Sequence, residues 1–334
     1  MKKLQHIIMV ALILIGLVTP ALAQEQTDDF NVAAKHAIAI ESTTGKVLYE
    51  KDATTPDGVA SMTKILTAYM VYKAIDQGKI TWDTEVDISD YPFNLTVDSE
   101  VSNVPLDSRK YTVKQLLDAT LISSANSAAI ALAEKISGTE SAFVDTMKAQ
   151  LKKWGITDAK LYNASGLNNK YLGDNRYPGS KPDDENTMSA LDVAIIADHL
   201  IKDYPQVLDI TKQGEVDFEG DNKLTTHNYM LEGQDNYREG VDGLKTGTTE
   251  LAGASFVAHS NENGMSLITV VMNADNGGED EAARFTATND LLDYVVQHWK
   301  INKLNTKGQI VKKNDIKVAD GVSKTVSVCA DRQQ

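Results

Sequence analysis

Ser61-Met62-Thr63-Lys64 is the stretch on which the interpretation of this 334-residue sequence depends. Two other short motifs follow it along the chain, Ser124-Ala125-Asn126 and then Lys245-Thr246-Gly247. Alone, each motif is better explained by ordinary structure, such as a helix-capping serine or a lysine beside a turn. Together, in this order, they predict one reactive site built from three segments, which supply a nucleophile, a proton shuttle and a substrate clamp.

The first motif has the spacing of a nucleophile and its base. Residues 62–75 carry apolar side chains every three or four positions, which predicts a helix that begins at the motif. Positions three apart share a helix face, so the Ser61 hydroxyl would lie beside the Lys64 amine. A serine hydroxyl needs such a base. Lys64 can act as one if burial and a second cation, for which Lys245 is a candidate, lower its pKa.

The second motif is a polar interruption between two apolar stretches, which indicates a tight connection between helices lining a cleft. Ser124 could relay a proton from the lysines to the leaving amine. Asn126 could donate its amide to a substrate carbonyl and accept from Lys64. Ser123 competes with Ser124 as the functional serine.

The third motif, Lys245-Thr246-Gly247-Thr248, lies beside a predicted strand, where an extended peptide can bind to the sheet edge. Gly247 would allow close approach of a substrate backbone. The hydroxyls of Thr246 and Thr248 and the charge of Lys245 could bind a C-terminal carboxylate. The backbone N–H groups of Ser61 and Thr248 could together form an oxyanion hole.

Short β-branched and apolar runs from both ends of the chain predict one antiparallel sheet. The expected strands are residues 36–40, 46–49, 243–248, 254–259 and 266–272. Thr43-Thr44-Gly45 and Asn261-Glu262-Asn263-Gly264 have the composition of hairpin turns. Helices are expected over residues 62–75, 113–121, 127–136, 143–154, 190–201 and 280–299. The predicted fold class is therefore α+β: an antiparallel sheet backed by helices, with an inserted all-helical lobe and a cleft between them.

The N-terminus has the features of a secretory signal peptide over residues 1–23. Lys2 and Lys3 precede an apolar stretch at residues 7–18, and Ala21-Leu22-Ala23 is a small-residue cleavage site. An uncleaved anchor is the alternative. The sequence therefore predicts an exported protein, whose net charge changes from −14 to −16 when the two lysines of the signal peptide are removed.

The mature sequence is predicted to contain a catalytic domain at residues 24–299 and an incomplete β-rich C-terminal domain at residues 300–334. Strands are expected there at residues 309–311, 316–318 and 325–328. The acidic net charge argues against nucleic acid and against direct binding to anionic lipid. Cys329 is the single cysteine, so no intramolecular disulfide can form, and export without disulfides indicates a bacterial surface.

We expect no metal and no cofactor. The histidines of the mature sequence form no His-x-x-x-His pair; they are His36, His199, His227, His259 and His298. The acidic stretch at residues 275–281 is typical of a solvated turn rather than a calcium site.

With residues 41–51, Asn163-Ala164-Ser165-Gly166-Leu167 and Asp242-Gly243-Leu244, the three motifs resemble those of the D-alanyl-D-alanine carboxypeptidases. These are low-molecular-mass penicillin-binding proteins of the serine-type, β-lactamase/transpeptidase-like family. The similarity covers about residues 34–299. It implies removal of the terminal D-alanine from peptidoglycan stem pentapeptides through a Ser61 acyl-enzyme, with β-lactam antibiotics as inhibitors.

The resemblance also implies a location at the outer face of the bacterial cytoplasmic membrane or in the cell wall. The family usually continues into a complete β-rich domain and an amphipathic tail that lies on the membrane. We therefore expect membrane contact only for a longer form with such a tail, and release for the form ending at residue 334.

Other reaction types remain open at this point. A class A β-lactamase shares the first and third motifs but needs a deacylating glutamate, and residues 161–169 contain no acid. A transpeptidase would use the same residues with an amine acceptor. A β-lactam-sensing or wall-binding module without turnover would keep the binding residues alone.

Overall fold

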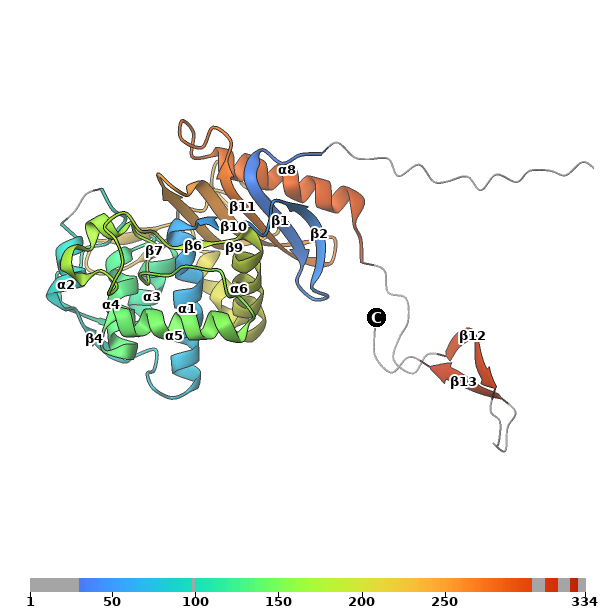
Figure 1. Cartoon of the computed structure of the whole chain (residues 1–334), viewed down its shortest axis with the longest axis horizontal. Coiled ribbons are helices and arrows are strands. Elements are labelled where there is room, and N and C mark those ends of the chain that lie inside the picture. Colours follow the sequence, from blue (N-terminus) through green and yellow to red (C-terminus); the bar gives the residue numbers. More distant parts are fainter. Residues whose placement is uncertain (1–29, 98–99, 302–309, 318–324, 330–334) are drawn as a thin grey trace, which may run out of the picture. The chain divides into compact units, whose positions relative to one another are not determined.

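The computed structural model describes residues 30–97, 100–301, 310–317 and 325–329 (Figure 1). The predicted signal peptide lies outside the described residues. The central element is a five-stranded antiparallel sheet in the order β2-β1-β11-β10-β9. Its strands are β1 (Ala34–Glu41), β2 (Lys46–Lys51), β9 (Val241–Thr249), β10 (Gly253–Glu262) and β11 (Met265–Ala274). The β1–β11 pairing joins the two ends of the domain's sequence, as predicted.

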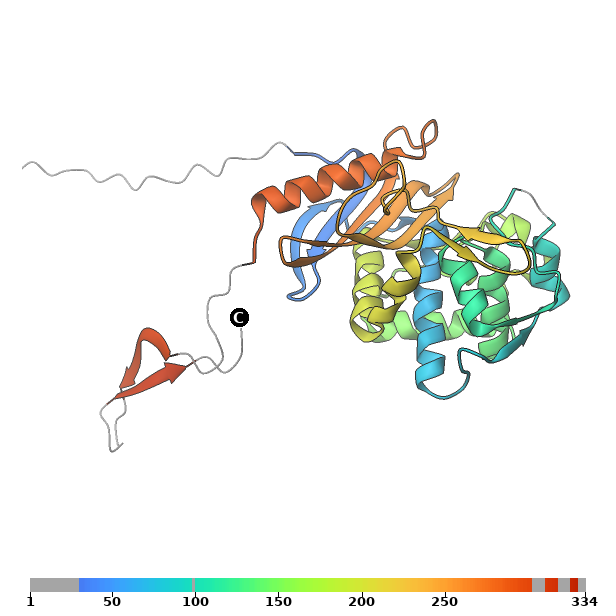
Figure 2. The ribbon, with the colours of Figure 1, turned by 180° about the vertical axis from the view of Figure 1, so that it is seen from behind.

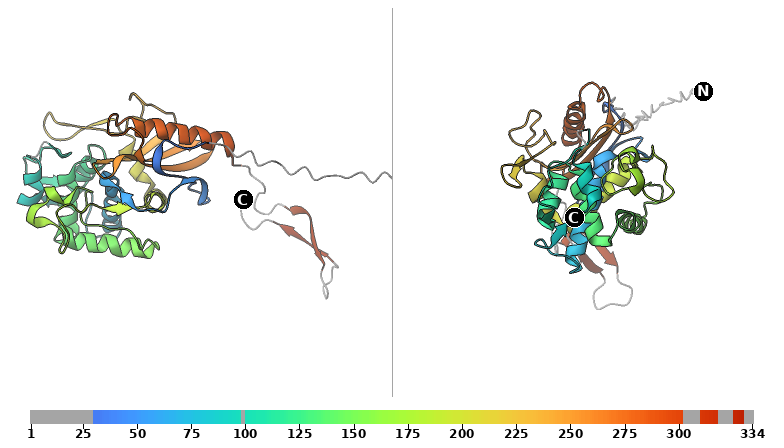
Figure 3. Two further views of the ribbon diagram at one scale, coloured as in Figure 1. Left: turned by 45° about the horizontal axis from the view of Figure 1, so that its top comes forward. Right: turned by 90° about the vertical axis from the view of Figure 1, so that its left-hand side faces the viewer.

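The sheet is buried on both faces because helices cover each of them. α8 (Ala283–His298) packs on one face, and α6 (Ala190–Asp203) packs on the other (Figures 1 and 3). Consecutive residues of β11 are therefore almost all buried, which explains why this strand is a continuous apolar run rather than an alternating one.

The helical lobe is inserted between β2 and β9, on one side of the sheet (Figure 2). Its main helices are α1 (Thr63–Asp76), α3 (Val113–Leu121), α4 (Asn126–Ser137) and α5 (Glu140–Lys153). α1 is buried around almost its whole circumference and packs against α3, α4, α5 and α6. The predicted α+β class with an inserted helical lobe is thus confirmed.

Element boundaries differ from the prediction in a few places. The predicted helix at 62–75 is preceded by the 3₁₀ turn η1 (Ala60–Met62), and α5 begins before residue 143 because the Thr139 hydroxyl caps it by accepting from Ala142 N. Where two strands were expected at 309–311 and 316–318, the structure has one, β12 (Ile310–Lys317), paired with β13 (Thr325–Cys329).

The short elements were not predicted, since two to six residues give too little periodicity. They are α2 (Asp90–Leu95), α7 (Leu208–Thr211), β3 (Asp57–Gly58), β4 (Glu85–Asp87), β5 (Lys110–Thr112), β6 (Thr187–Met188), β7 (Glu215–Asp217), β8 (Lys223–Thr225), η2 (Asn169–Tyr171), η3 (Gly173–Asn175) and η4 (Pro205–Val207). Among the described residues, no helix has the length and apolar character needed to cross a membrane.

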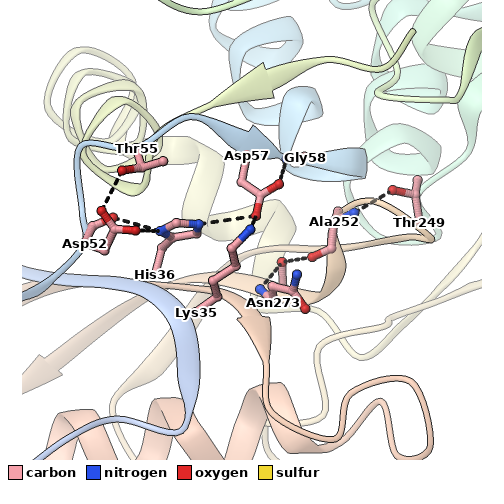
Figure 4. A network of polar contacts seen from close by, with 10 residues as sticks. Lys35, His36, Asp52, Thr55, Asp57, Gly58, Thr249, Ala252 and Asn273 are labelled. Atoms are coloured by element: carbon pink, nitrogen blue, oxygen red, sulfur yellow. Dashed lines mark hydrogen bonds and ion pairs between the residues drawn. The ribbon is translucent and has the colours of Figure 1, made fainter. Parts of the chain in front are cut away.

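A polar network fixes the segment that leads into Ser61 (Figure 4). The buried His36 ring on β1 contacts the Asp52 backbone oxygen through Nδ1, at 2.8 Å, and Asp57 Oδ2 through Nε2, at 3.2 Å. Lys35 Nζ also donates to Asp57 Oδ2, at 2.8 Å. Burial raises the pKa of Asp57, but hydrogen bonds from Lys35 and Gly58 outweigh it and hold the pKa below its usual value.

Because the folded-state pKa of Asp57 is lowered, its contribution to stability is present above its usual pKa of 3.8 and is lost as pH falls through the lower folded value. We expect Asp57→Asn to reduce the free energy of unfolding at neutral pH by about 1–3 kcal/mol, the typical cost of breaking a charge-assisted hydrogen bond. Urea titrations between neutral pH and about pH 2 should show this difference shrinking as the pH falls. The exposed Asp83→Asn is the control, and a penalty that does not depend on pH would contradict the expectation.

Candidate active site

The side chain of Lys64 lies at the centre of the candidate site and is fully buried. Its Nζ makes three hydrogen bonds: to Ser61 Oγ at 2.7 Å, to Asn126 Oδ1 at 2.7 Å and to the Ser165 backbone oxygen at 2.8 Å. The spacing of three at a helix start therefore brings Ser61 and Lys64 together, and the second motif contributes the next contact. Ser165 was not among the predicted site residues, because its contribution is a backbone oxygen.

Two buried lysine amines in this region have lowered pKa values. Burial and the neighbouring charge of Lys245 hold the pKa of Lys64 well below its usual value of 10.5. Burial and the Arg284 guanidinium lower the pKa of Lys245 to about 7. A neutral Lys64 amine retains two N–H donors for Asn126 and Ser165, and it can offer its lone pair to the Ser61 hydroxyl.

The second motif is a tight turn before α4, as predicted. Ser124 is buried, has a φ of 58°, and lines the same pocket as Ser61 and Thr246. Ser123, the competing serine, instead binds the backbone of Thr225 through its hydroxyl, with 2.9 Å to N and 3.2 Å to O. Ser124 is thus the serine that faces the pocket.

Asn126 begins α4 and binds both neighbouring segments. In addition to accepting from Lys64, it uses one N–H of Nδ2 to donate to the Ser102 backbone oxygen, at 2.8 Å. Its amide is therefore held in a defined orientation beside Ser61, and both residues line the same pocket.

The third motif lies on β9, which is an edge strand of the sheet, so its outer backbone groups face the pocket rather than another strand. The structure gives a reason for Gly247 that differs from the predicted one. A Cβ at this position would lie 2.8 Å from the Val59 oxygen and 3.2 Å from Met62 N. The close approach that requires glycine in this structure is to the segment carrying Ser61, and the approach of a substrate backbone stays a prediction.

Lys245 lies below the pocket instead of lining it. It is 2% exposed, and its Nζ donates to the Thr246 backbone oxygen at 3.1 Å. Arg284, from α8, does line the pocket, together with Ser61, Thr248 and His227. Arg284 was not predicted from the sequence. It is the single arginine in a helix that was expected to cover the sheet with apolar side chains, and this exception could have identified it.

The turn at residues 163–167 supplies the Ser165 oxygen, and the structure fixes it tightly. Asn163 Oδ1 accepts from the backbone N of Gly166 at 2.6 Å, and the buried Glu140 carboxylate accepts from Ala164 N at 2.8 Å. Gly166 has a φ of 85°, and a Cβ on it would lie 1.8 Å from the Ala60 oxygen. The turn is therefore packed directly against the residue that precedes Ser61.

Comparison with known proteins agrees with this geometry. The fold and the Ser61–Lys64 pair define a serine-type peptidase. The chain matches the D-alanyl-D-alanine carboxypeptidase family over residues 22–276. It therefore belongs to that family, as the sequence predicted, and is a peptidase and hydrolase.

Individual relatives cover most of the chain. D-alanyl-D-alanine carboxypeptidase DacF of Bacillus subtilis (strain 168) is 30% identical, with 98% of this chain and 79% of that protein covered. The crystal structure of a peptidoglycan synthesis regulatory factor (PBP3) from Streptococcus pneumoniae is 56% identical with a TM-score of 0.85, covering 91% of this chain and 85% of that one. Penicillin-binding protein D2 from Listeria monocytogenes, in its ampicillin-bound form, is 26% identical with a TM-score of 0.66, covering 80% and 99% respectively.

The packing of Gly166 against Ala60 generates a test with a matched control. Gly166→Ala should reduce kcat/KM by about 10²-fold, because the added methyl displaces the residue before Ser61 and small misplacements of reacting groups have costs of this order. Gly138→Ala introduces the same positive-φ strain, at a φ of 81°, with no atom within 4 Å of the new Cβ. It should lose about 1 kcal/mol of stability and keep its activity. Equal loss of activity in both variants would show that backbone strain alone is responsible.

Proposed function

We propose that Ser61 is the nucleophile of a D-alanyl-D-alanine carboxypeptidase that shortens peptidoglycan stem pentapeptides by their terminal D-alanine. The observation that carries the proposal is the fully buried Lys64 amine, with Nζ 2.7 Å from Ser61 Oγ and with a lowered pKa. This is the arrangement required for a base that is neutral near physiological pH and already hydrogen-bonded to the hydroxyl it deprotonates.

In the proposed acylation step, Lys64 takes the proton of the Ser61 hydroxyl while Ser61 Oγ attacks the carbonyl carbon of the penultimate D-alanine. The backbone N–H groups of Ser61 and Thr248 would stabilise the oxyanion. The second N–H of Asn126 would donate to the carbonyl oxygen of the preceding peptide bond. Ser61, Asn126 and Thr248 line one pocket, and Lys64 is hydrogen-bonded to Ser61 behind it, which supports these roles.

The leaving amine of D-alanine needs a proton when the peptide bond breaks. We assign the relay to Ser124, since its side chain lines the pocket beside Thr246 on the side of Arg284. The proton that Lys64 accepted would pass through the Ser124 hydroxyl to the amine. A water molecule then attacks the acyl-enzyme, with Lys64 again acting as the base.

The terminal carboxylate is better matched by Arg284 and Thr248 than by Lys245. The guanidinium lines the pocket and keeps its charge at any relevant pH, whereas Lys245 does not line the pocket and its pKa is lowered to about 7. We therefore assign to Lys245 the role of lowering the pKa of Lys64 through its charge, which revises the clamp role predicted from the sequence. Thr246 and Thr248 line the same pocket as Arg284, which supports the predicted role of their hydroxyls in binding the carboxylate.

β-lactams are the expected inhibitors. The Listeria relative has been crystallised with ampicillin and with cefotaxime bound, and it shares the fold of this chain. We propose that Ser61 opens the lactam ring in the same way as it attacks the peptide. Because its bulky ring-derived portion remains attached, the acyl group would block the approach of water and the adduct would persist. Peptidoglycan lies outside the cytoplasmic membrane, so the proposed substrate implies a location at the cell surface, in agreement with the predicted export signal.

A direct test of the function uses the wild type and Ser61→Ala. Incubated with a D-Ala-D-Ala peptide, the wild type should release D-alanine and the shortened peptide, even with a competing D-amino acid. Incubated with a penicillin, it should gain one long-lived adduct by mass spectrometry, and Ser61→Ala should do neither. Mostly exchanged peptide would indicate a transpeptidase, rapid penicillin turnover a β-lactamase, and binding without turnover of either compound a binding module.

The role of Lys64 as base can be tested separately. Lys64→Arg retains the positive charge but cannot lose a proton near neutral pH, so the acylation rate should fall by at least about 10²–10⁴-fold. Stopped-flow acylation with a fluorescent penicillin measures this rate without requiring deacylation. The exposed Lys79→Arg, in the turn that follows the same helix, is the control. Acylation by a folded Lys64→Arg variant at the wild-type rate would rule out the assignment.

A further inference from the structure

Every N–H donor of Arg284 is already in use in the free protein. A guanidinium has five such donors. Nε donates to the backbone oxygen of Glu281 at 2.7 Å, and Nη1 donates to the backbone oxygens of Gly247 and Ser255 at 3.1 and 3.3 Å. Nη2 donates to Thr248 Oγ1 at 2.7 Å and to Glu281 Oε2 at 2.6 Å. No donor is left for an incoming carboxylate unless one partner leaves.

Three of these five acceptors are backbone oxygens, those of Gly247, Ser255 and Glu281, which cannot leave without moving the chain. The other two belong to side chains. Thr248 Oγ1 also donates a hydrogen bond, so it can stay beside Arg284 and bind the incoming carboxylate itself. The Glu281 side chain, by contrast, is 68% exposed, and its other partner is the Thr248 hydroxyl at a long 3.4 Å. Glu281 also lines the pocket that contains Ser61 and Arg284. Its carboxylate is therefore the group that a ligand carboxylate would replace.

We propose that Glu281 is a specificity-determining residue whose carboxylate occupies, in the free enzyme, the position taken by the C-terminal carboxylate of the substrate. The inference rests on the proposed function, because it takes the substrate to end in a free carboxylate bound by Arg284 and Thr248. The acidic stretch at residues 275–281, expected from the sequence to be only a solvated turn, thereby acquires a role at its last residue.

Replacement of the Glu281 carboxylate by a ligand depends on the charge of the ligand's C-terminus. An incoming carboxylate offers Nη2 of Arg284 the same charged acceptor that Glu281 offers, so one anion replaces another. A peptide ending in an amide offers a neutral oxygen, which is a weaker acceptor, and Glu281 then stays in place. The internal carboxylate thus reduces the affinity for a substrate with a free C-terminus, which must compete with it for Nη2, and does not affect an amide, which does not take this position.

The test compares two peptides that differ only at the C-terminus, one a free acid and the other its amide, with the wild type and Glu281→Gln. Glutamine keeps the size of the side chain and removes its charge. KM for the acid should fall about two- to fivefold, the range that corresponds to loss of an exposed ion pair, with kcat retained. KM for the amide should remain within error. Glu279→Gln removes an exposed charge from the same loop and should change neither constant.

Inhibition by free D-alanine provides a second measurement that does not depend on turnover of the variant. Its inhibition constant should decrease in Glu281→Gln by the same factor as KM for the acid. An unchanged or higher KM for the acid peptide would overturn the inference and show that Glu281 orients Arg284 for binding. An equal decrease for acid and amide would also overturn it, as a general effect of charge. If the wild type cleaves neither peptide, the proposed function itself fails. If the wild type cleaves the acid peptide, the change in KM between wild type and Glu281→Gln bears on Glu281 alone.

Discussion

The burial of the Lys64 amine is the interaction on which the rest of the structure depends. Lys64 is among the largest fully buried side chains, and its position in the first turn of the buried helix α1 excludes water from it. An ammonium ion there is strongly disfavoured, so burial makes the amine a base. The same burial would be destabilising if the amine had no partners. Three polar partners from three segments satisfy it, and stability and reactivity therefore require the same three contacts.

Because Lys64 must be held against its partners, the segment that carries Ser61 is tightly enclosed. Ala60 has a φ of 44°, which is uncommon for a residue with a side chain and persists only when its surroundings enforce it. Two glycines enforce it by close approach: Gly166 from the turn that holds Lys64, and Gly247 from the edge strand. The His36–Asp57 network fixes the same segment on its upstream side. Residues distant in sequence therefore share the task of orienting Ser61.

The fold and most of the site could be predicted from the sequence because they depend on local pattern. The five strands are short apolar and β-branched runs, the six longer helices have clear periodicity, and the spacing within each motif specifies which of its side chains lie together. Arg284 and Ser165 could not be predicted in the same way. Arg284 enters the pocket only because α8 packs on the sheet and brings its first turn to Gly247 of β9, and Ser165 contributes a backbone oxygen that no residue type identifies. The reason for Gly247 was also beyond the sequence, since it depends on how closely two segments pack.

The charges of the site form a chain in which each group sets the state of the next. Burial lowers the pKa of Arg284, and the Glu281 carboxylate opposes that effect. The Arg284 charge adds to burial in lowering the pKa of Lys245, and the Lys245 charge adds to burial in lowering the pKa of Lys64. If one carboxylate replaces another at Arg284, the field acting on both lysines stays nearly the same. Lys64 is then as ready to accept a proton before the substrate binds as afterwards, and no rearrangement of charge has to precede the attack by Ser61.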